Sequence, residues 1–571
     1  MLAPRPLLKP ATIGGFTFAD AAPDVIDATG VPIALAATGT TNGVGNQGDQ
    51  ALQADLARNT LGVTGAGVRV GILSDSFDLH GGYAADIVSG ALPAGIAILQ
   101  DGPSGGGDEG RAMAQLVHKV APGADIAFYS AFRGIADFAT GIRALASAGA
   151  NVIVDDVTYL NEPFFQDGGA IQSAVASVVA QGVSYFTSAS NQGTNFYQSG
   201  FNGIATKLPG LAGTYKAQNF GTAAVPSTMQ SLTIAPGSTT TIDLQWDQPF
   251  ASISGGTGSA DSIGIVLYNA AGKIVATALA NRTGGDPVQT LRFTNTTASG
   301  DFRLAIVTNG GSYAPNLFKY IVYGQGTTIN DANAGKGSGT VIGHEMQAGA
   351  NSVGAIAAAN TTQLGGTGTV EKFSSVGPGT ILFDAQGNRL TDSVTGHKVD
   401  FVAPDGIATS VFSTFYGTSA AAPNAAGVAA LMLQANTALS PAQVTTMLAR
   451  SATKVIGPAN GIGTGLIQAH SAVAQAIAAL PTTTTPPIVS LGPSGPQTSH
   501  WEIAPEITPV QAAIAAIAAD PTAAGDFFTQ LETGAIAEHF QPETGGVFAL
   551  VQNAYADVAL IDPAWAVHPT A

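Results

Sequence analysis

Short apolar runs and amphipathic segments alternate along two stretches of the chain, residues 46–205 and 336–480. The run at 68–73 is bounded by glycine and is typical of a strand buried on both faces of a parallel sheet. This alternation predicts an α/β fold with a mostly parallel sheet and helices on both faces. Strands are expected at 68–73, 124–130, 151–154, 183–186 and 352–356, and helices at 111–120, 134–148, 170–182, 425–435, 442–452 and 468–480.

The pattern changes between residues 206 and 335, where apolar and polar residues alternate one by one. Residues 241–247 follow this two-residue period strictly, and turn signals such as Asn309-Gly310-Gly311 separate the neighbouring runs. Short strands with such turns predict an antiparallel β-sandwich inserted into the α/β part. Its other strands are expected at 263–268, 273–278, 291–294, 302–307 and 319–323.

These patterns, together with local composition, predict the domain organisation. Ser440-Pro441-Ala442-Gln443 is a capping box with Pro at the first helical position, so a helix of the second α/β part should begin there. The expected segments are an irregular N-terminal arm (1–45), the α/β domain in two parts (46–205 and 336–480), the inserted sandwich (206–335), a Pro/Thr-rich linker (481–504) and a short Ala-rich, helical tail (505–571).

Charge and composition exclude several classes of partner. The 571 residues carry a formal net charge of −17, which argues against nucleic acid and anionic membrane surfaces. The absence of cysteine rules out disulfides and thiolate chemistry. No apolar run reaches the roughly eighteen residues that a membrane span needs. Residues 1–10 hold two basic residues and three prolines and are not typical of a signal peptide.

The candidate nucleophile is Ser419, in the stretch 417–423 (GTSAAAP), immediately before a helix of small apolar residues. Free N–H groups and the helix dipole favour negative charge at such a helix start. A serine nucleophile passes through an oxyanion, so this environment suits acyl transfer. The alternative is that Ser419 is only a helix cap, but a cap does not require the preceding Gly-Thr and the following run of small residues.

This stretch resembles the nucleophile motif of the subtilisin-like serine peptidases, or subtilases, although Asn424 stands where that family usually has His. The resemblance covers roughly residues 46–205 and 336–480. Asp75, which follows the apolar run at 68–73, is similar to the family's triad aspartate. Asn191, in SASNQG, is similar to its oxyanion-hole asparagine, and the chain order of the three residues agrees. As alternatives, Asp75 and Asn191 taken singly would each be ordinary turn residues.

The sequence departs from the family at the base. Glu109 begins the helix that should carry the triad histidine, with Asp108 as its expected N-cap. His118 lies nine residues further along and faces the other side of that helix, which favours a packing or surface role. The sedolisin-like serine-carboxyl peptidases resemble this chain in using Glu. Their second helix carboxylate is replaced by Met113, and their oxyanion aspartate by Asn191.

A carboxylate base changes the expected pH dependence. Glu109 would accept the Ser419 proton with an ordinary pKa near ~4.3, instead of ~6.5 for histidine. The helix start favours ionised Glu109, whereas a proton shared with Asp75 would raise one apparent pKa, and we expect sharing to dominate.

Asp155 and Asp156 follow the strand at 151–154, which lines the substrate cleft in subtilases. Since adjacent strand residues point to opposite faces, at most one can face the substrate. That residue would tune Glu109, bind a cation or favour a basic or polar substrate side chain. The alternative is a solvated loop pair.

The resemblance implies a secreted or cell-surface bacterial serine endopeptidase, despite the lack of a clear signal peptide. Asp75, Glu109 and Ser419 would form its catalytic set, with Asn191 in the oxyanion hole and Asp155 and Asp156 as candidates in the substrate cleft. Polypeptides would be its substrates, with neither nucleic acid nor membrane as partner. The sequence assigns no cofactor or metal and identifies no residues for a calcium site. The alternative function is a catalytically silent subtilase fold that binds or adheres through the insertion.

Overall fold

The computed structural model describes residues 25–27, 44–311, 315–395 and 399–480. The described residues belong to one compact unit, which ends at Thr482. The expected linker and tail, and most of the expected N-terminal arm, lie outside the described residues. Within that arm, the structure adds an unexpected three-residue strand, β1 (Val25–Asp27), which pairs antiparallel with β6 (Val157–Tyr159).

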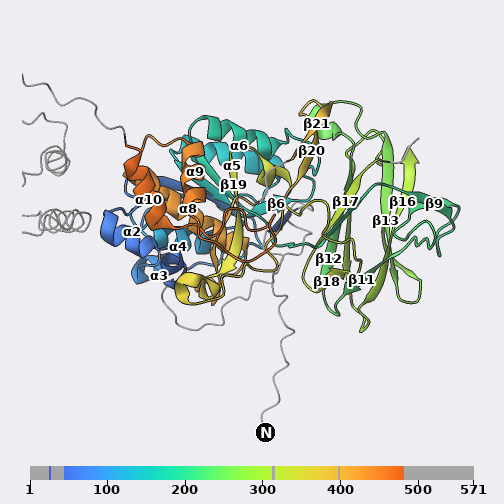
Figure 1. Ribbon diagram of the computed structural model, residues 1–571, viewed down its shortest axis with the longest axis horizontal. Coiled ribbons are helices and arrows are strands. Elements are labelled where there is room, and N and C mark those ends of the chain that lie inside the picture. Colours follow the sequence, from blue (N-terminus) through green and yellow to red (C-terminus); the bar gives the residue numbers. More distant parts are fainter. Residues whose placement is uncertain (1–24, 28–43, 312–314, 396–398, 481–571) are drawn as a thin grey trace, which may run out of the picture. The chain divides into compact units, whose positions relative to one another are not determined.

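A seven-stranded sheet forms the centre of the α/β part (Figure 1). All neighbouring strands run parallel, which confirms the predicted sheet. The sheet order is β22 (Phe401–Asp405), β19 (Ala350–Ala357), β7 (Ser184–Ser188), β5 (Val152–Asp155), β2 (Arg69–Ser74), β4 (Asp125–Ser130) and β3 (Ala97–Gln100).

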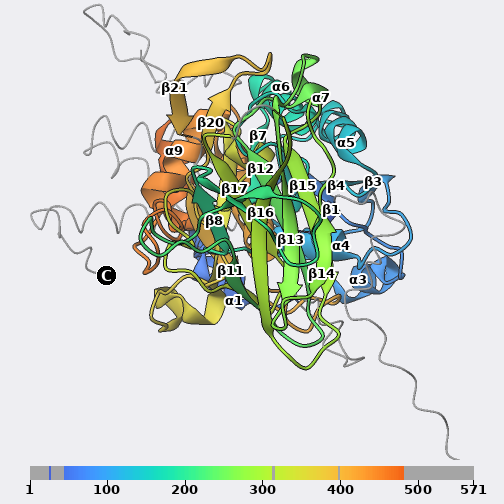
Figure 2. The same ribbon diagram turned by 90° about the vertical axis from the view of Figure 1, so that its right-hand side faces the viewer.

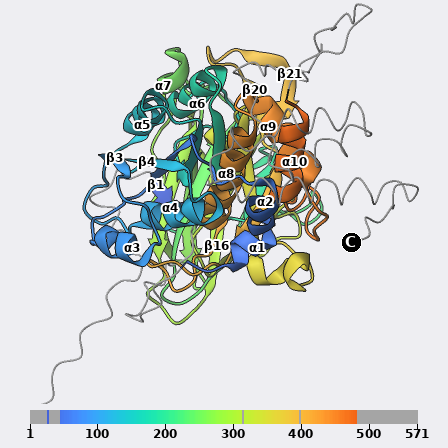
Figure 3. The same cartoon turned by 90° about the vertical axis from the view of Figure 1, so that its left-hand side faces the viewer.

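Helices cover both faces of this sheet, as predicted (Figure 3). On one face, Ile72 and Val154 pack with α4 (Glu109–Val120) and α8 (Thr418–Ala435). On the other face, their strand neighbours Leu73 and Ile153 pack with α5 (Ile135–Ser147) and α6 (Ala170–Ala180). The remaining helices of this part include α1 (Gln47–Ala51), α2 (Ala54–Leu61), α9 (Pro441–Ser451) and α10 (Ala469–Ala478).

Local signals explain which helix boundaries could be predicted. The capping box at the start of α9 is present, since the Ser440 hydroxyl accepts from the Gln443 N–H and the Gln443 side chain accepts from the Ser440 N–H. No helix or strand was expected between β2 and α4, where the structure has α3 (Tyr83–Ser89) and β3. Neither has a clear apolar face, because α3 buries only Asp86 and β3 is half-exposed. No helix in the described ranges has the length and apolar character needed to cross a bilayer.

The inserted segment forms two antiparallel sheets, as predicted, although two of their strands begin before the expected boundary at residue 206 (Figure 2). Apolar side chains of β12 and β17 pack against those of β13 and β16 to form the core between the sheets. The smaller sheet has the order β15 (Val288–Thr294), β12 (Thr239–Trp246), β17 (Phe318–Tyr323) and β8 (Phe196–Ser199). The larger sheet contains β14 (Ile274–Ala278), β13 (Asp261–Asn269), β16 (Asp301–Gly311), β10 (Tyr215–Gln218), β9 (Gly203–Thr206), β11 (Gln230–Ile234) and β18 (Thr327–Ile329).

The smaller sheet also contacts the α/β part through its outer face. Ile321 and Tyr323 of β17 pack with Phe164 and Ile342 in a separate apolar cluster. The buried Gln245 amide of β12 donates to the backbone carbonyls of residues 160 and 162. The insertion is therefore docked on the loop that follows β6.

A two-stranded hairpin, β20 (Thr380–Phe383) and β21 (Arg389–Thr395), was not predicted and lies after the insertion.

Candidate active site

Asp75 lies directly after β2, at the carboxyl end of the strand, as the sequence predicts. Its carboxylate accepts backbone N–H groups from Ser76, Gly107, Glu109 and Gly110, the last two at 2.9 and 3.4 Å. Glycine at position 110 lets the start of α4 lie this close to the loop after β2, because a Cβ there would lie 2.3 Å from the Phe128 ring and 2.8 Å from the Ser76 carbonyl oxygen. Asp75 therefore anchors the first turn of α4.

Glu109 is the first residue of α4 and is fully buried. The expectation that Asp108 caps this helix is wrong: its backbone is left-handed (φ 57°) and its side chain makes no capping bond. The Asp108 carboxylate instead accepts the Ser76 hydroxyl at 3.0 Å and two backbone N–H groups of the loop after β2. Arg111 pairs with Asp86 at 2.6 Å.

Ser419 lies in the first turn of α8, is fully buried, and its hydroxyl has no hydrogen-bond partner among the described residues. Asn191 holds the preceding residue, since its Oδ1 accepts both the Thr418 N–H and the Thr418 hydroxyl at 3.0 Å. Gly417 has φ +108°, and a Cβ there would lie 3.0 Å from Asn191 Nδ2. The Gly-Thr-Ser motif thus seats the Asn191 amide beside the serine turn.

Two further contacts fix this turn. The buried Asp405, at the end of β22, accepts the Gly417 N–H at 2.8 Å. Asn424, which stands in place of the family's histidine, donates to the carbonyls of Pro404 and Ala420 at 3.0 Å. Asn424 therefore has a structural role inside α8.

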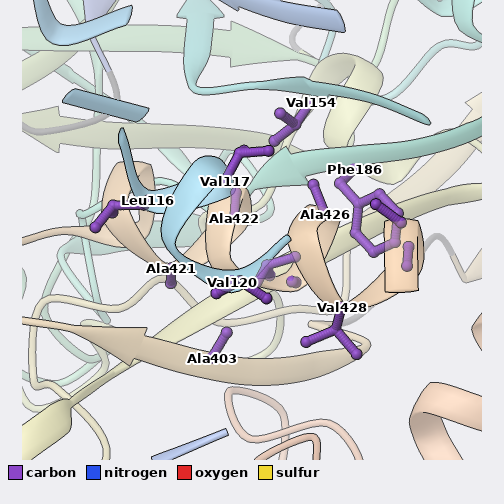
Figure 4. Close-up of a cluster of buried hydrophobic side chains, with 14 of the residues drawn as sticks. Leu116, Val117, Val120, Val154, Phe186, Ala403, Ala421, Ala422, Ala426 and Val428 are labelled. Carbon is purple, nitrogen blue, oxygen red and sulfur yellow. The ribbon is translucent and has the colours of Figure 1, made fainter. Parts of the chain in front are cut away.

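Close packing fixes the helices that carry Glu109 and Ser419. Leu116, Val117 and Val120 of α4 lie against the small side chains of α8 (Figure 4). Gly427 of α8 approaches so closely that a Cβ there would lie 2.8 Å from the Val120 Cβ. The run of alanine after Ser419 is explained by this contact, because larger residues would force α4 and α8 apart.

Asp155 and Asp156 are both fully buried, which rules out the solvated loop pair. Neither Asp156 oxygen makes a hydrogen bond of ordinary length and angle within the described residues. The Ser74 hydroxyl and the Glu109 carboxyl are nevertheless close enough to interact with it. Burial, followed by the Asp75 charge, raises the pKa of Asp156 well above its usual range, and Ser74 and Glu109 oppose that rise.

The Asp155 side chain points into a different cluster, as alternation along a strand requires. Its Oδ1 accepts the Thr187 hydroxyl at 3.0 Å and contacts His344 Nε2 at 3.1 Å. Nδ1 of His344 contacts both oxygens of Glu162 at 2.9 Å. Burial alone would lower the pKa of His344, but the Glu162 and Asp155 carboxylates outweigh it and hold that pKa well above its usual range.

Sequence reasoning missed this cluster and the buried glutamate next to it. Glu345 Oε1 accepts the hydroxyls of Thr158 (2.5 Å) and Ser190 (2.6 Å), and Ser190 immediately precedes Asn191. Burial raises the pKa of Glu345 to about 7, although the His344 charge and the hydrogen bonds lower it. Glu345 thereby links the segment after Asp156 to the loop that carries Asn191.

Other chemistry-bearing residues lie elsewhere. His118 is half-buried on α4, and burial lowers its pKa, with Lys119 adding to the effect. Among the described residues, no group of three or more His, Cys, Asp or Glu side chains is placed to hold a metal ion.

Comparison with known proteins decides the family. The model of the subtilase family matches residues 90–465, more than half of the chain. The chain belongs to the subtilase family of peptidases. This match includes Glu109, Asn191 and Ser419 and begins after Asp75.

Individual relatives are more distant. Alkaline elastase YaB of a Bacillus species is 31% identical over 185 residues, which are 31% of this chain and 46% of that protein. This chain therefore spans about half the length of that curated relative. The structure of the CspB protease of Clostridium perfringens covers 76% of this chain and 98% of its own, with 14% identity and a TM-score of 0.48. A Pseudoalteromonas arctica protease structure covers 74% and 94%, with 14% identity and a TM-score of 0.34.

Proposed function

We propose that this subtilase is a serine-type endopeptidase that acts through an acyl-enzyme on Ser419. The main support is the setting of Ser419 itself. Its buried hydroxyl makes no hydrogen bond to a described residue, and the neighbouring Thr418 is held by Asn191. A cap would use its hydroxyl to accept an N–H of the first turn. A hydroxyl left available at a helix start suits a nucleophile.

Glu109 is the proposed base. Ser419 Oγ attacks the peptide carbonyl carbon while its proton moves to the Glu109 carboxylate, and the Asn191 amide donates to the oxyanion. The tetrahedral intermediate then expels the amine, which takes the proton back from Glu109. Water, activated by the same carboxylate, releases the acyl group. This set is subtilase-like in Asp75 and Asn191, and sedolisin-like in the use of Glu.

Asp75 and Asp156 have different proposed roles around Glu109. Asp75 accepts four backbone N–H groups and fixes the start of α4, which keeps it beside Glu109 as the expected partner. Asp156 has a raised pKa and lies against the Glu109 carboxyl, so it is a second partner that can share a proton with Glu109. In the singly protonated pair, Asp156 donates to Glu109 and leaves it ionised for catalysis.

A strand of the chain itself supports a polypeptide substrate. β1 pairs antiparallel with β6 through Val25–Tyr159, Ile26–Thr158 and Asp27–Val157. β6 begins directly after Asp156. A strand edge that pairs with one peptide segment is suited to bind another through its main chain. We also propose the domain division expected from sequence, with the antiparallel sheets as an inserted domain, and export to the cell exterior.

A serine-directed phosphonate probe tests this function. Wild type should be labelled, and Ser419→Ala should not. The free energy of unfolding of the variant should stay within about 0.5–2 kcal/mol of wild type, the range that a serine at a helix start contributes. Failure of wild type to label or to cleave any peptide would favour the silent, binding alternative. Full hydrolysis by Ser419→Ala would end the serine-peptidase proposal.

A further inference from the structure

A cavity of about 400 Å³ joins the candidate site to the inserted sheets. One part of the lining is the loop from Asn191 to Asn195, and another is the segment 324–329, which follows β17 and includes β18. Lys372 and Phe373 complete the lining from the α/β part. Asn191 lines the cavity and also holds Thr418 beside Ser419, so the cavity adjoins the proposed oxyanion residue.

The walls of this cavity are rigidly connected. The Asn195 amide donates to the Thr327 carbonyl at 3.0 Å, which ties the Asn191 loop to the insertion. The Gly193 N–H donates to the Phe373 carbonyl at 2.7 Å, which ties the same loop to the Lys372 segment. The cavity is therefore built jointly by the two parts of the structure and would lose one wall without the insertion.

The lining chemistry selects for negative charge. Lys372 is the sole charged residue among those that line the cavity and is exposed, while side chains such as Thr194 and Gln325 are neutral and polar. The net charge of −17 repels an anionic ligand in the cavity only weakly, because salt screens the repulsion from exposed charges more than about 8–10 Å away. A nearby ammonium group then dominates recognition.

We propose that this cavity is a substrate subsite that binds an aspartate or glutamate of the polypeptide, adjacent to the scissile bond, through Lys372. The inserted sheets would thus determine substrate specificity. This inference rests on the proposed peptidase function. The subsite adds ground-state and transition-state binding alike, so Lys372 acts mainly on KM.

The test compares peptide pairs that carry Asp or Asn at one position, placed either before or after the cleaved bond. For one of the two placements, wild type should prefer Asp. Lys372→Met should reduce that preference about fivefold through KM, in line with an exposed ion pair, and Lys372→Glu should reverse it. Lys216→Glu, an exposed lysine of β10 outside the cavity, is the matched control and should leave the preference unchanged.

A cavity-filling variant tests the insertion's wall. Gln325→Trp should weaken cleavage of long peptides severalfold and spare substrates truncated on the responsive side, whereas Val225→Trp, on an exposed loop outside the cavity, should do neither. If neither Lys372→Glu nor Gln325→Trp changes the substrate preference, the proposed subsite is wrong, while the peptidase function stands. If wild type cleaves no peptide, binding of a labelled Asp peptide to Ser419→Ala decides the subsite alone: loss of binding in the Lys372→Glu background supports it, and unchanged binding overturns it.

Discussion

Asp155 and Asp156 are neighbours in sequence, equally buried, and lie in two different chemical environments. Asp155 faces the imidazole of His344, which Glu162 contacts from the other side. Asp156 faces Glu109 and lacks a cationic partner among the described ion pairs. The same side chain is therefore compensated on one face of the sheet and left uncompensated on the other.

This difference distinguishes a buried charge that stabilises the fold from a buried charge that can take part in proton transfer. A buried carboxylate paired with an imidazolium holds segments together, and here it joins β5 to the loop after β6 and to residue 344, beyond the insertion. A buried carboxylate beside another carboxylate is costly unless one of them keeps a proton. Such a cost is typical of sites that move protons, which supports our proposal that Asp156 lies on the functional face.

The largest effect expected from this comparison is on stability. Asp155→Asn removes one of the two carboxylates that compensate His344, so the free energy of unfolding near neutral pH should fall, by less than the roughly 3–5 kcal/mol of a fully broken buried pair because Glu162 remains. Because Asp155 does not face Glu109 in this account, turnover of the folded enzyme at low temperature should stay within a fewfold of wild type. Chemical denaturation and initial rates measure both. A loss of turnover without a loss of stability would place Asp155, instead of Asp156, on the functional face.

The same substitution one residue later should have the opposite profile. A raised folded pKa means that Asp156 supports stability below its unfolded pKa near ~3.8 and that this support is lost as the pH rises through the folded value. Asp156→Asn should therefore equal wild type near pH 3–4 and exceed it in stability at neutral pH. The variant keeps a donor to Glu109 but cannot ionise, so the alkaline limb of its rate profile should move up or vanish. Asp156→Ala lacks that donor and should lose roughly tenfold in turnover.

A smaller effect is expected at Glu345, between the two environments. Its pKa is about 7 in the folded protein and ~4.5 in the unfolded chain, so wild type should lose stability as the pH rises from about 4.5 to 7. Glu345→Gln should flatten that slope, because glutamine does not titrate. Denaturation at several pH values measures it, with the exposed Asp301→Asn as control. An unchanged slope in Glu345→Gln would assign the pH dependence to other groups.

The parts of the site that follow local rules could be predicted from sequence. Asp75 ends a buried strand, and Ser419 follows Gly-Thr at the start of a helix, so both could be located from the pattern alone. The fold was predictable for the same reason, since strand and helix periods differ clearly. α3 and β3 were missed because they bury little apolar surface.

Contacts between distant segments could not be predicted. His344 and Glu162 are 182 residues apart, with the whole insertion between them, and nothing in the segment around His344 indicates a partner. Asp156 faces Glu109 because of the way β5 lies beside β2. The sequence shows only that Asp155 and Asp156 point to opposite faces of the sheet, and it does not say which face each residue occupies. The prediction that Asp108 caps α4 was wrong for a related reason: its carboxylate accepts backbone N–H groups of the loop after β2 instead of an N–H of its own helix.

The proposed role of Glu109 as the base is tested most directly by measuring kcat/KM against pH for wild type and Glu109→Gln on a mixed peptide library. Glutamine keeps the size and hydrogen bonding of Glu109 but cannot accept the Ser419 proton. Wild type should work best on the acid side of neutrality, and Glu109→Gln should lose about two or more orders of magnitude at every pH. Equal rates in the two proteins, or a wild-type optimum that needs deprotonated histidine and disappears in His118→Ala, would mean that Glu109 is not the base.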